Sequence, residues 1–267
     1  MIEPLEPLAP LDLFAPFRSN PAFAPWVAAY STRRGGASAP PFDSHNLGFS
    51  TGDDPASVRE NRQRLSDAVG APLDAWVVPG QCHGKEVLTV GREDASEGAL
   101  APSARFRGFD AVLLAEPGIF ALSLSADCPL VVIADPNQRR GGVAHAGWRG
   151  TAVGVVEALL EALAAAGSDL TECYAALSPG ICGGCFEVGE EVFEAVADLP
   201  GARAARDGNR LDLRRIHREA LTIAGFSPDR ISRSPYCSFE DASVCFSHRR
   251  DKGRTGRNGA IVGWRES

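Results

Sequence analysis

The stretch from Ser123 to Gly167 reads SLSADCPLVVIADPNQRRGGVAHAGWRGTAVGVVEALLEALAAAG and predicts an α/β fold. Leu130 to Ala134 is a short apolar run rich in β-branched residues, which predicts a buried strand. A turn at residues 135–137 leads to a second predicted strand, Gly142 to His145. From about Thr151, apolar residues recur at helical spacing and Gly167 ends the run: Val155, Val156, Leu159, Leu160 and Leu163.

Two reactive side chains lie at the ends of these strands. Cys128 precedes the first strand, and His145 ends the second, just before the predicted helix. Proteins of the α/β class place chemistry at strand ends beside a helix N-terminus. A thiolate beside an imidazole can act as a nucleophile with its base, or the two can be ligands of a zinc ion.

A third candidate ligand lies upstream, in PGQCHGKEVLTV, where His83 stands between two glycines. One cysteine and two histidines, with a fourth position left for water, are the pattern of a catalytic zinc. The helix after His145 is expected to disfavour its imidazolium form and to favour the Cys128 thiolate, which would help a metal bind at neutral pH. The alternative is a buried cysteine and two hydrogen-bonded histidines.

Short strands and helices are also predicted outside this stretch. The predicted strands are residues 26–31, 76–78, 110–114, 119–124, 173–177 and 260–264, with 110–114 and 119–124 as neighbours. The predicted helices are residues 54–70, 190–197 and 213–224. Because no internal repeat or linker interrupts them, residues 26–267 are expected to form one compact α/β domain. Residues 1–25 are rich in proline and predict an extended arm.

Composition excludes several classes of protein. The chain has 267 residues and a net charge of −7, which argues against a nucleic-acid-binding surface. No apolar run approaches the roughly 20 residues needed to cross a bilayer, and the N-terminus lacks the basic region of a signal peptide. Seven cysteines, an odd number, predict reduced thiols and a cytoplasmic protein rather than a disulfide framework.

Two polar segments allow two interpretations each. The loop of residues 31–50 carries Arg33, Arg34, His45 and Asn46, which are either solvated or in contact with substrate. The tail SHRRDKGRTGRNG is either a solvated face or an anion site, and it contains Arg249, Arg250, Lys252, Arg254 and Arg257. Cys182 and Cys185 form a C-x-x-C without a second pair, so buried or half-buried thiols are expected. His217, on a predicted helix, is expected to be structural.

Motifs along nearly the whole chain after Val27 resemble one family. In order they are STRRGGAS, FDSHNLGFSTGDDPASVRENRQRL, GQCHGKEV, SADCPLVVIADP, VAHAGWRGT, LSPGICGGCFEVGEEV and CSFEDASVCFSHRRDKGRTGRNGAIVGW. They are similar to the multicopper polyphenol oxidase, or laccase-domain, family, whose members are also described as purine nucleoside phosphorylases and peptidoglycan editing factors. The resemblance implies mixed β-sheets flanked by helices, in a cysteine-hydrolase-like fold. It also implies that His83, Cys128 and His145 are both metal ligands and catalytic residues.

The resemblance implies two reactions. One is zinc-dependent phosphorolysis of adenosine, inosine or methylthioadenosine, which yields the free base and a ribose 1-phosphate. The other is hydrolytic deamination of adenosine. Zinc is the expected metal, with copper as the alternative, and it would lower the pKa of a bound water to about 7. Charge alone suggests that Arg149, Arg249 and Arg250 hold the phosphate.

Other functions stay open at this point. Cys128 and His145 fit an amide hydrolase, such as an editor of peptidoglycan precursors, because the family's fold also resembles that of cysteine-dependent deamidase toxins. A metal-binding protein without enzymatic activity is another alternative. Polyphenol oxidation by several coppers fits less well, since five histidines are too few for a trinuclear cluster beside a blue-copper centre. The P-loop, H-E-x-x-H, G-x-S-x-G and zinc deaminase signatures do not occur.

Overall fold

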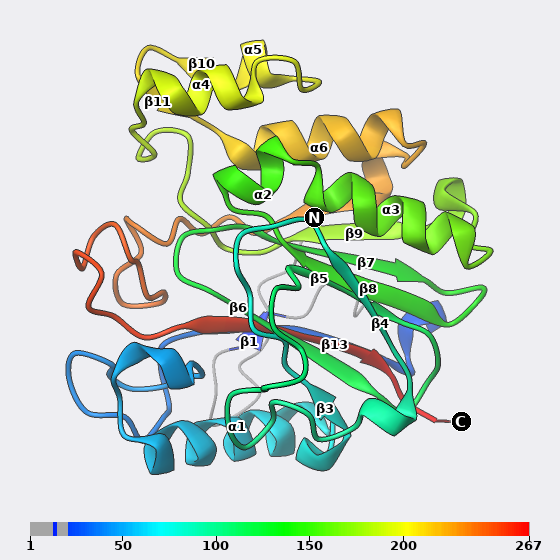
Figure 1. The fold of residues 1–267 in the computed structure, drawn as a ribbon, viewed down its shortest axis with the longest axis vertical. Coiled ribbons are helices and arrows are strands. Elements are labelled where there is room, and N and C mark those ends of the chain that lie inside the picture. The colour runs from blue at the N-terminus through cyan, green and yellow to red at the C-terminus, as the bar shows by residue number, and fades with distance from the viewer. Residues whose placement is uncertain (1–12, 15–20, 267) are drawn as a thin grey trace.

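Two β-sheets form the centre of the computed structural model, which describes residues 13–14 and 21–266 (Figure 1). The five-stranded sheet has the order β1 (Leu13–Phe14), β2 (Trp26–Ser31), β13 (Asn258–Trp264), β6 (Phe120–Ser125) and β3 (Trp76–Val77). The six-stranded sheet has the order β12 (Ile231–Arg233), β9 (Tyr174–Leu177), β7 (Leu130–Asp135), β8 (Arg140–His145), β5 (Ala111–Leu114) and β4 (Val87–Val90). Both sheets contain parallel and antiparallel pairs, as the resemblance implied.

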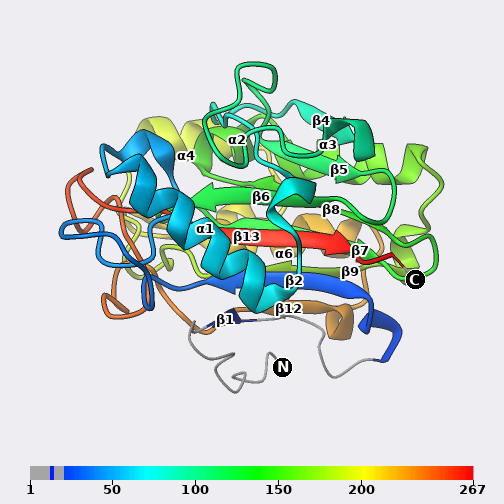
Figure 2. The same ribbon diagram turned by 90° about the horizontal axis from the view of Figure 1, so that it is seen from below.

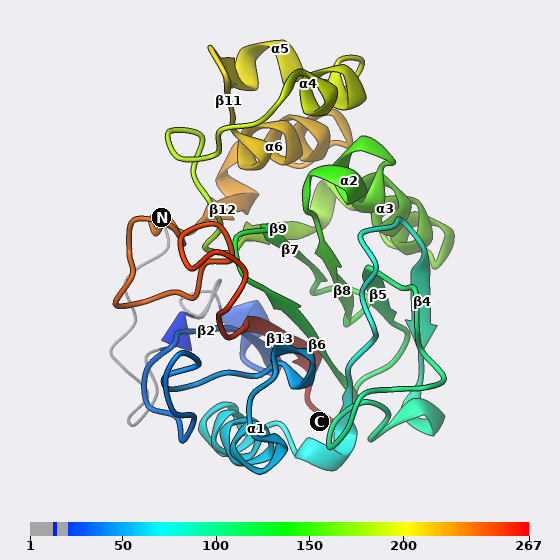
Figure 3. The same ribbon diagram turned by 60° about the vertical axis from the view of Figure 1, so that its left-hand side comes forward.

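Helices cover the outer faces of both sheets. The α-helices are α1 (Pro55–Val69), α2 (Trp148–Ala152), α3 (Val155–Ala165), α4 (Glu190–Val196), α5 (Ala202–Ala205) and α6 (Leu213–Ile223). Single 3-10 turns lie at Pro21–Phe23, Phe49–Thr51, Leu73–Ala75, Arg92–Asp94, Leu170–Glu172 and Pro228–Arg230. Helix α1 lies below the five-stranded sheet, across β13 and β2, whereas α3 and α6 lie above the six-stranded sheet (Figures 1 and 2). A small cap of α4, α5 and the hairpin β10 (Arg206–Asp207) to β11 (Arg210–Leu211) packs beyond α6 (Figure 3).

Alternating side chains along the strands fill the spaces between these layers. In β7, Leu130 and Val132 point into the core between the two sheets, and Val131 and Ile133 pack under α3. Both faces of the strand are therefore buried, which explains why its sequence is continuously apolar. A third core between α1 and the five-stranded sheet includes Leu65.

Helix α1 agrees with its sequence signals. The Asp54 side chain accepts a hydrogen bond from the backbone amide of Ala56, and Pro55 occupies the first turn. Gly70 ends the helix in the left-handed conformation, with φ of 62°. The predicted strands and the helices at 190–197 and 213–224 are also present, with ends that shift by one or two residues.

Two predictions about the fold are wrong. Residues 110–114 and 119–124 are not neighbours in one sheet, because β5 pairs with β4 and β8 whereas β6 pairs with β13 and β3. The helix expected from Thr151 to Gly167 is two helices, because the chain breaks at Gly154 in the left-handed conformation, with φ of 82°. As a result, α2 is a separate short helix directly after His145.

Most of the expected N-terminal arm, residues 1–25, lies outside the described residues. Of the part that is described, Leu13–Phe14 pair with β2. The ring of Phe23 is buried against Tyr174, with a centroid distance of 4.8 Å, and near Trp264. Across the described residues, every helix is too short or too polar to span a bilayer.

Candidate metal centre

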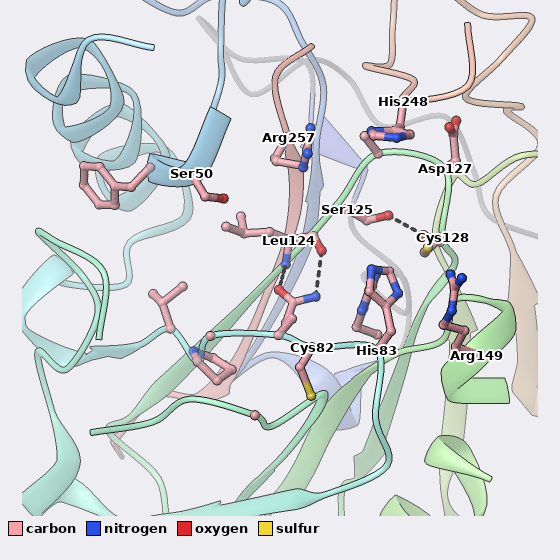
Figure 4. Close-up of a pocket in the computed structure, with 18 of the residues that line it drawn as sticks. Ser50, Cys82, His83, Leu124, Ser125, Asp127, Cys128, Arg149, His248 and Arg257 are labelled. Carbon is pink, nitrogen blue, oxygen red and sulfur yellow. Dashed lines mark hydrogen bonds between the residues drawn. The ribbon is translucent and has the colours of Figure 1, made fainter. Parts of the chain in front are cut away.

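A cavity of about 760 Å³ opens where the loops after β3, β6 and β8 meet the C-terminal tail (Figure 4). His83 lies on the loop after β3, Cys128 on the loop between β6 and β7, and His145 at the end of β8. Their ligand atoms all lie within 4.8 Å of one another. Three side chains from distant parts of the sequence thus converge on one wall of the cavity, as the sequence suggested.

The burial of the three side chains increases toward the core. His145 is buried, Cys128 is partly exposed, and His83 is exposed to the cavity. The rings of His83 and His145 have centroids 4.8 Å apart and are tilted by 58°. A cation held between these atoms would therefore keep one side open to a ligand in the cavity, which is the arrangement of a catalytic metal.

Asp110 orients His145. The Nδ1 atom of His145 lies 2.8 Å from Oδ1 of Asp110, so the hydrogen-bond network assigns the proton to Nδ1 and leaves Nε2 to face Cys128. The other carboxylate oxygen of Asp110 accepts hydrogen bonds from the backbone amides of Cys82 and Gly84, which flank His83. One buried carboxylate therefore positions two of the three candidate ligands.

The local charges favour ionisation of Cys128 and protonation of His145 in the metal-free protein. Burial raises the pKa of Cys128, but the charge of His145 and hydrogen bonds from both histidines outweigh burial and lower this pKa to about 6. Burial lowers the pKa of His145, but the Cys128 thiolate and Asp110 raise it to about 9. The expected preference of the helix for a neutral His145 does not decide the protonation of His145 in the metal-free protein, because two nearby anions outweigh the partial charge of a five-residue helix.

The space between the ligands depends on Gly147. A methyl group on this residue would lie 2.6 Å from Sγ of Cys128 and 3.2 Å from Nδ1 of His83. Only hydrogen at this position leaves room for a further atom between the thiol and the imidazole. The glycine of the HAGWRG segment thus forms part of the cradle, although its backbone angles suit other residues.

Asp127 links the thiol loop to the C-terminal tail. Its carboxylate accepts hydrogen bonds from Oγ of Ser238 and from the backbone amide of Arg249, each at 2.7 Å. Asp127 has φ of 96° and His83 has φ of 65°, a conformation that residues other than glycine adopt at a cost of about 1–3 kcal/mol. Two residues at the candidate centre are therefore held in strained conformations by their surroundings.

Arginine side chains dominate the charge of the cavity. Its lining includes five of them, Arg62, Arg107, Arg149, Arg249 and Arg257, and a single acidic residue, Asp127. The guanidinium of Arg249 lies over the ring of Phe186, and that of Arg149 lies over the ring of Trp148. A cavity of this composition attracts anions such as phosphate.

The phosphate contact expected of Arg250 does not fit the structure. Its guanidinium pairs with Asp251 and donates hydrogen bonds to the carbonyl oxygens of Ser238 and Cys245. These partners fix Arg250 inside the tail, away from the residues that line the cavity. Arg257, which shares the same tail, lines the cavity in its place.

The polar residues of the loop at 31–50 divide into two pairs: Arg33 and Arg34 reach the surface, whereas His45 and Asn46 are buried rather than solvated. His45 and Asn46 are fully buried, and the ring nitrogens of His45 lie against the carbonyl oxygens of Thr32 and Asn61. Arg33 pairs with Asp43 and lies over the ring of Phe246. Arg34 donates to the carbonyl oxygen of Ser243.

Two further residues of the candidate site, Asp110 and Arg257, could have been found in the sequence. Asp110 is the first residue of a predicted strand, and a carboxylate at a strand end is a known partner for a metal-ligating histidine. Arg257 was part of the basic tail, but its charge looked the same as that of Arg250. Only the three-dimensional positions show which arginine reaches the cavity.

Comparison with known proteins identifies the family of the chain. The profile of the family described as multi-copper polyphenol oxidoreductase laccase matches residues 27–265. A relative named purine nucleoside phosphorylase YlmD, from Bacillus subtilis, is 33% identical over 248 residues, which cover 90% of this chain and 89% of the relative. A purine nucleoside phosphorylase from Deinococcus radiodurans is 38% identical over 239 residues, 88% of each chain.

Solved structures share the fold over almost the full length. The crystal structure of YfiH from Bacillus licheniformis has a TM-score of 0.92 at 30% identity, and the match covers 98% of this chain and 100% of YfiH. YlmD from Geobacillus stearothermophilus has a TM-score of 0.82 at 32% identity, with 92% and 94% of the two chains covered. The chain therefore belongs to the multi-copper polyphenol oxidoreductase laccase family.

Proposed function

We propose that the protein is a purine nucleoside phosphorylase that depends on a metal, most simply zinc, held by His83, Cys128 and His145. The observation that carries the proposal is the convergence of these three donors on the wall of a cavity that five arginines line. Relatives along nearly the whole chain bear the name purine nucleoside phosphorylase. Purine nucleosides and phosphate would be the small molecules that enter the cavity.

The donor set fits zinc. One thiolate and two imidazoles suit Zn²⁺, and a thiolate also suits copper(I), which stays the alternative metal. When bound, the metal would supply Lewis acidity, drawing electron density from a substrate atom and increasing the acidity of a water molecule. Asp110 would fix the orientation of His145, and Gly147 would leave the space that the ion needs.

A single metal is what the histidines support. All five lie within the described residues, and His45 and His217 are buried away from the cavity with hydrogen-bonding partners of their own. The buried position of His217, against Thr151, agrees with the structural role expected for it. Oxidation of polyphenols by several coppers therefore has little support from the positions of these residues.

The cavity residues have separate tasks in phosphorolysis. Arg149 and Arg249 would bind phosphate and hold one of its oxygens toward C1′ of the ribose, with Arg257 adding positive charge. The new C–O bond forms as the glycosidic C–N bond breaks, and the departing purine takes up a proton. The rings of Phe49, Trp148 and Phe186 offer apolar surfaces on which a purine can stack.

Adenosine, inosine and methylthioadenosine are the substrates that we propose, with adenosine deamination by water as a second activity. Product analysis on these nucleosides, with and without phosphate, tests both. Free base with ribose 1-phosphate, formed only when phosphate is present, would support phosphorolysis. Inosine formed from adenosine without phosphate would support deamination. An unchanged nucleoside in every reaction would contradict the proposal.

A second candidate function rests on a separate observation. Cys128, His145 and Asp110 form a connected series in which the thiol is ionised near pH 7, as in cysteine hydrolases. The two functions respond differently to reagents. Removal of the metal with a chelator should abolish nucleoside cleavage by the metal enzyme, whereas amide hydrolysis by a Cys–His pair would survive the chelator and be lost on thiol alkylation.

Replacement of Arg249 by alanine should weaken phosphate binding. Because a charge-assisted contact contributes roughly 1.5–3 kcal/mol, the KM for phosphate should rise by about 10- to 150-fold. Deamination, which uses water, should change much less. Steady-state kinetics of both reactions provide the measurement. Arg254→Ala is the matched control, since Arg254 is an exposed arginine of the same tail outside the cavity lining; equal losses in both reactions would point to folding or purine binding instead.

Zinc binding at the cavity should release protons in a pH-dependent way. A metal requires the thiolate and the neutral imidazole. Between pH 6 and pH 9 the Cys128 thiol is already ionised and His145 is still protonated, so binding should release the proton of His145, and below pH 6 that of Cys128 as well. Zinc affinity should therefore fall as the pH falls. Calorimetry in buffers of different ionisation enthalpy measures this, and the difference between the native chain and Cys128→Ala isolates the cavity. Affinity that does not change between pH 6 and pH 9 would contradict the assignment of the proton to His145.

A further inference from the structure

A second group of metal-binding side chains lies outside the cavity. Cys182 and Cys185, which had no second pair in the sequence, lie beside Cys237 and Glu240. One ligand atom from each of these four residues, named here the thiol cluster, lies within 4.8 Å of every other. All seven cysteines of the chain are free thiols, so none of the cluster's sulfurs is used in a disulfide.

The topology of the six-stranded sheet explains why these residues meet. Strands β9 and β12 are parallel neighbours, so the loops that follow them leave the same edge of the sheet. Gly180 and Cys237 extend this pairing as an isolated parallel bridge, and the backbone amide of Ser238 donates to the carbonyl oxygen of Gly180. The C-x-x-C turn is thereby fixed against the segment that carries the third cysteine.

The local hydrogen bonds resemble those around metal-bound cysteines. The backbone amide of Cys182 donates to Sγ of Cys237 at 3.3 Å, and the amide of Cys185 donates to the carbonyl oxygen of Cys182 at 3.0 Å. An amide that points at a sulfur stabilises the thiolate form, which is the form that binds metals. The turn thus directs both of its sulfurs toward Cys237.

The distances are close to those of a tetrahedral zinc. With Zn–S bonds of about 2.3 Å, two sulfur ligands lie about 3.8 Å apart. Sγ of Cys182 lies 3.8 Å from Oε2 of Glu240, and no pair of donor atoms exceeds 4.8 Å. Small rotations of side chains at partly exposed positions would close the set around one ion.

We propose that the thiol cluster, Cys182, Cys185, Cys237 and Glu240, is a second zinc site with a structural role. Four protein ligands leave no position for substrate, in contrast to the three ligands of the cavity. Binding would release the thiol protons to solvent and form three Zn–S bonds and one Zn–O bond. Arg214, held by the carbonyl oxygens of Ser234 and Tyr236, would offset part of the remaining negative charge.

A divalent ion at the thiol cluster would neutralise the thiolates that bind it. The site would fasten together the loop that carries Phe186 and the segment that leads to Arg249, two residues of the cavity lining.

Native mass spectrometry of the reduced, zinc-loaded chain tests this inference. We expect two zinc ions on the native chain. Cys128→Ala lacks one of the three cavity ligands and should bind only the zinc ion of the thiol cluster. Cys128→Ala/Cys185→Ser should bind none. Cys128→Ala/Cys173→Ser is the matched control and should keep one zinc, because Cys173 is a buried thiol whose Sγ contacts the carbonyl oxygen of Asp169, away from the cluster.

Two results would overturn the inference. One is a Cys128→Ala chain that binds no zinc while its remaining thiols react as reduced thiols. The other is a chain two hydrogens lighter under the same reducing conditions, with a disulfide inside the cluster. Neither result tests the metal site of the cavity. That site is tested by the difference in bound zinc between the native chain and Cys128→Ala. The inference and the proposed function can therefore fail independently.

A second variant keeps the test valid if the cysteine variants do not fold. Glu240 is exposed, so Glu240→Gln on the Cys128→Ala background should fold. Its zinc affinity should fall by roughly 10-fold or more. Losing a direct ligand should weaken binding at least as much as changing a residue that only orients a ligand. Cobalt in place of zinc should show thiolate-to-metal charge-transfer absorption, and its absence would also overturn the inference.

Discussion

Replacement of Cys128 by alanine is expected to remove one zinc per chain and to abolish nucleoside phosphorolysis, with the fold intact. Lewis-acid catalysis is worth several kcal/mol, and each 1.4 kcal/mol is a factor of ten, so kcat/KM should fall by roughly 10³-fold or more. The fold should persist because Cys128 is partly exposed and belongs to none of the hydrophobic clusters of the core.

Metal analysis and thermal unfolding of the same preparation provide the measurement. Cys82→Ala is the matched control, because Cys82 is an exposed thiol of the same cavity that contacts Asp110 and lies outside the group of three ligands. It should keep its metal and most of its activity. Full zinc occupancy and activity in Cys128→Ala would show that the ligand assignment is wrong.

The sequence predicted the elements of the fold well where the information was local. The run at residues 130–134 has no polar position, which indicates a strand covered on both sides, and β7 is covered by the other sheet and by α3. Asp54, Pro55 and Gly70 mark the ends of α1 because capping depends only on neighbours in the chain.

Strand pairing was beyond the sequence, because pairing depends on distant segments. Strand β13, near the C-terminus, lies between β2 and β6, whereas β5 belongs to the other sheet. The helical periodicity also did not reveal the break at Gly154. The apolar positions of α3 begin directly after this residue, so the pattern gives no sign that Gly154 is left-handed. A single glycine inside a helical pattern is compatible with either outcome.

The candidate site shows the same division. The sequence patterns and the resemblance named three residues that do converge, His83, Cys128 and His145. Charge alone could not tell Arg250, which pairs with Asp251 inside the tail, from Arg257, which lines the cavity. The thiol cluster was missed for a related reason, because the third cysteine follows the C-x-x-C by more than fifty residues and approaches only through β9 and β12.

Replacement of Gly147 by alanine should block metal binding without removing any ligand. The added methyl group would lie 2.6 Å from Sγ of Cys128, closer than two such atoms can approach, and 3.2 Å from Nδ1 of His83. The thiol must then turn away from the histidines. We expect the zinc affinity of the cavity to fall by roughly 100-fold, the upper end of the loss that follows when a supporting residue is changed.

The effect should be confined to the centre, because φ of −66° and ψ of 167° suit alanine as well as glycine. Thermal unfolding of the metal-free variant should therefore match that of the metal-free native chain. Zinc titration should show the lower zinc affinity of the variant. Gly80→Ala is the matched control, since it adds the same methyl group elsewhere on the cavity wall, where the nearest atoms lie 3.5 Å away. If Gly147→Ala bound zinc as tightly as the native chain, the ion could not lie between Cys128 and His83, and the thiolate–imidazolium pair would become the better account of the site.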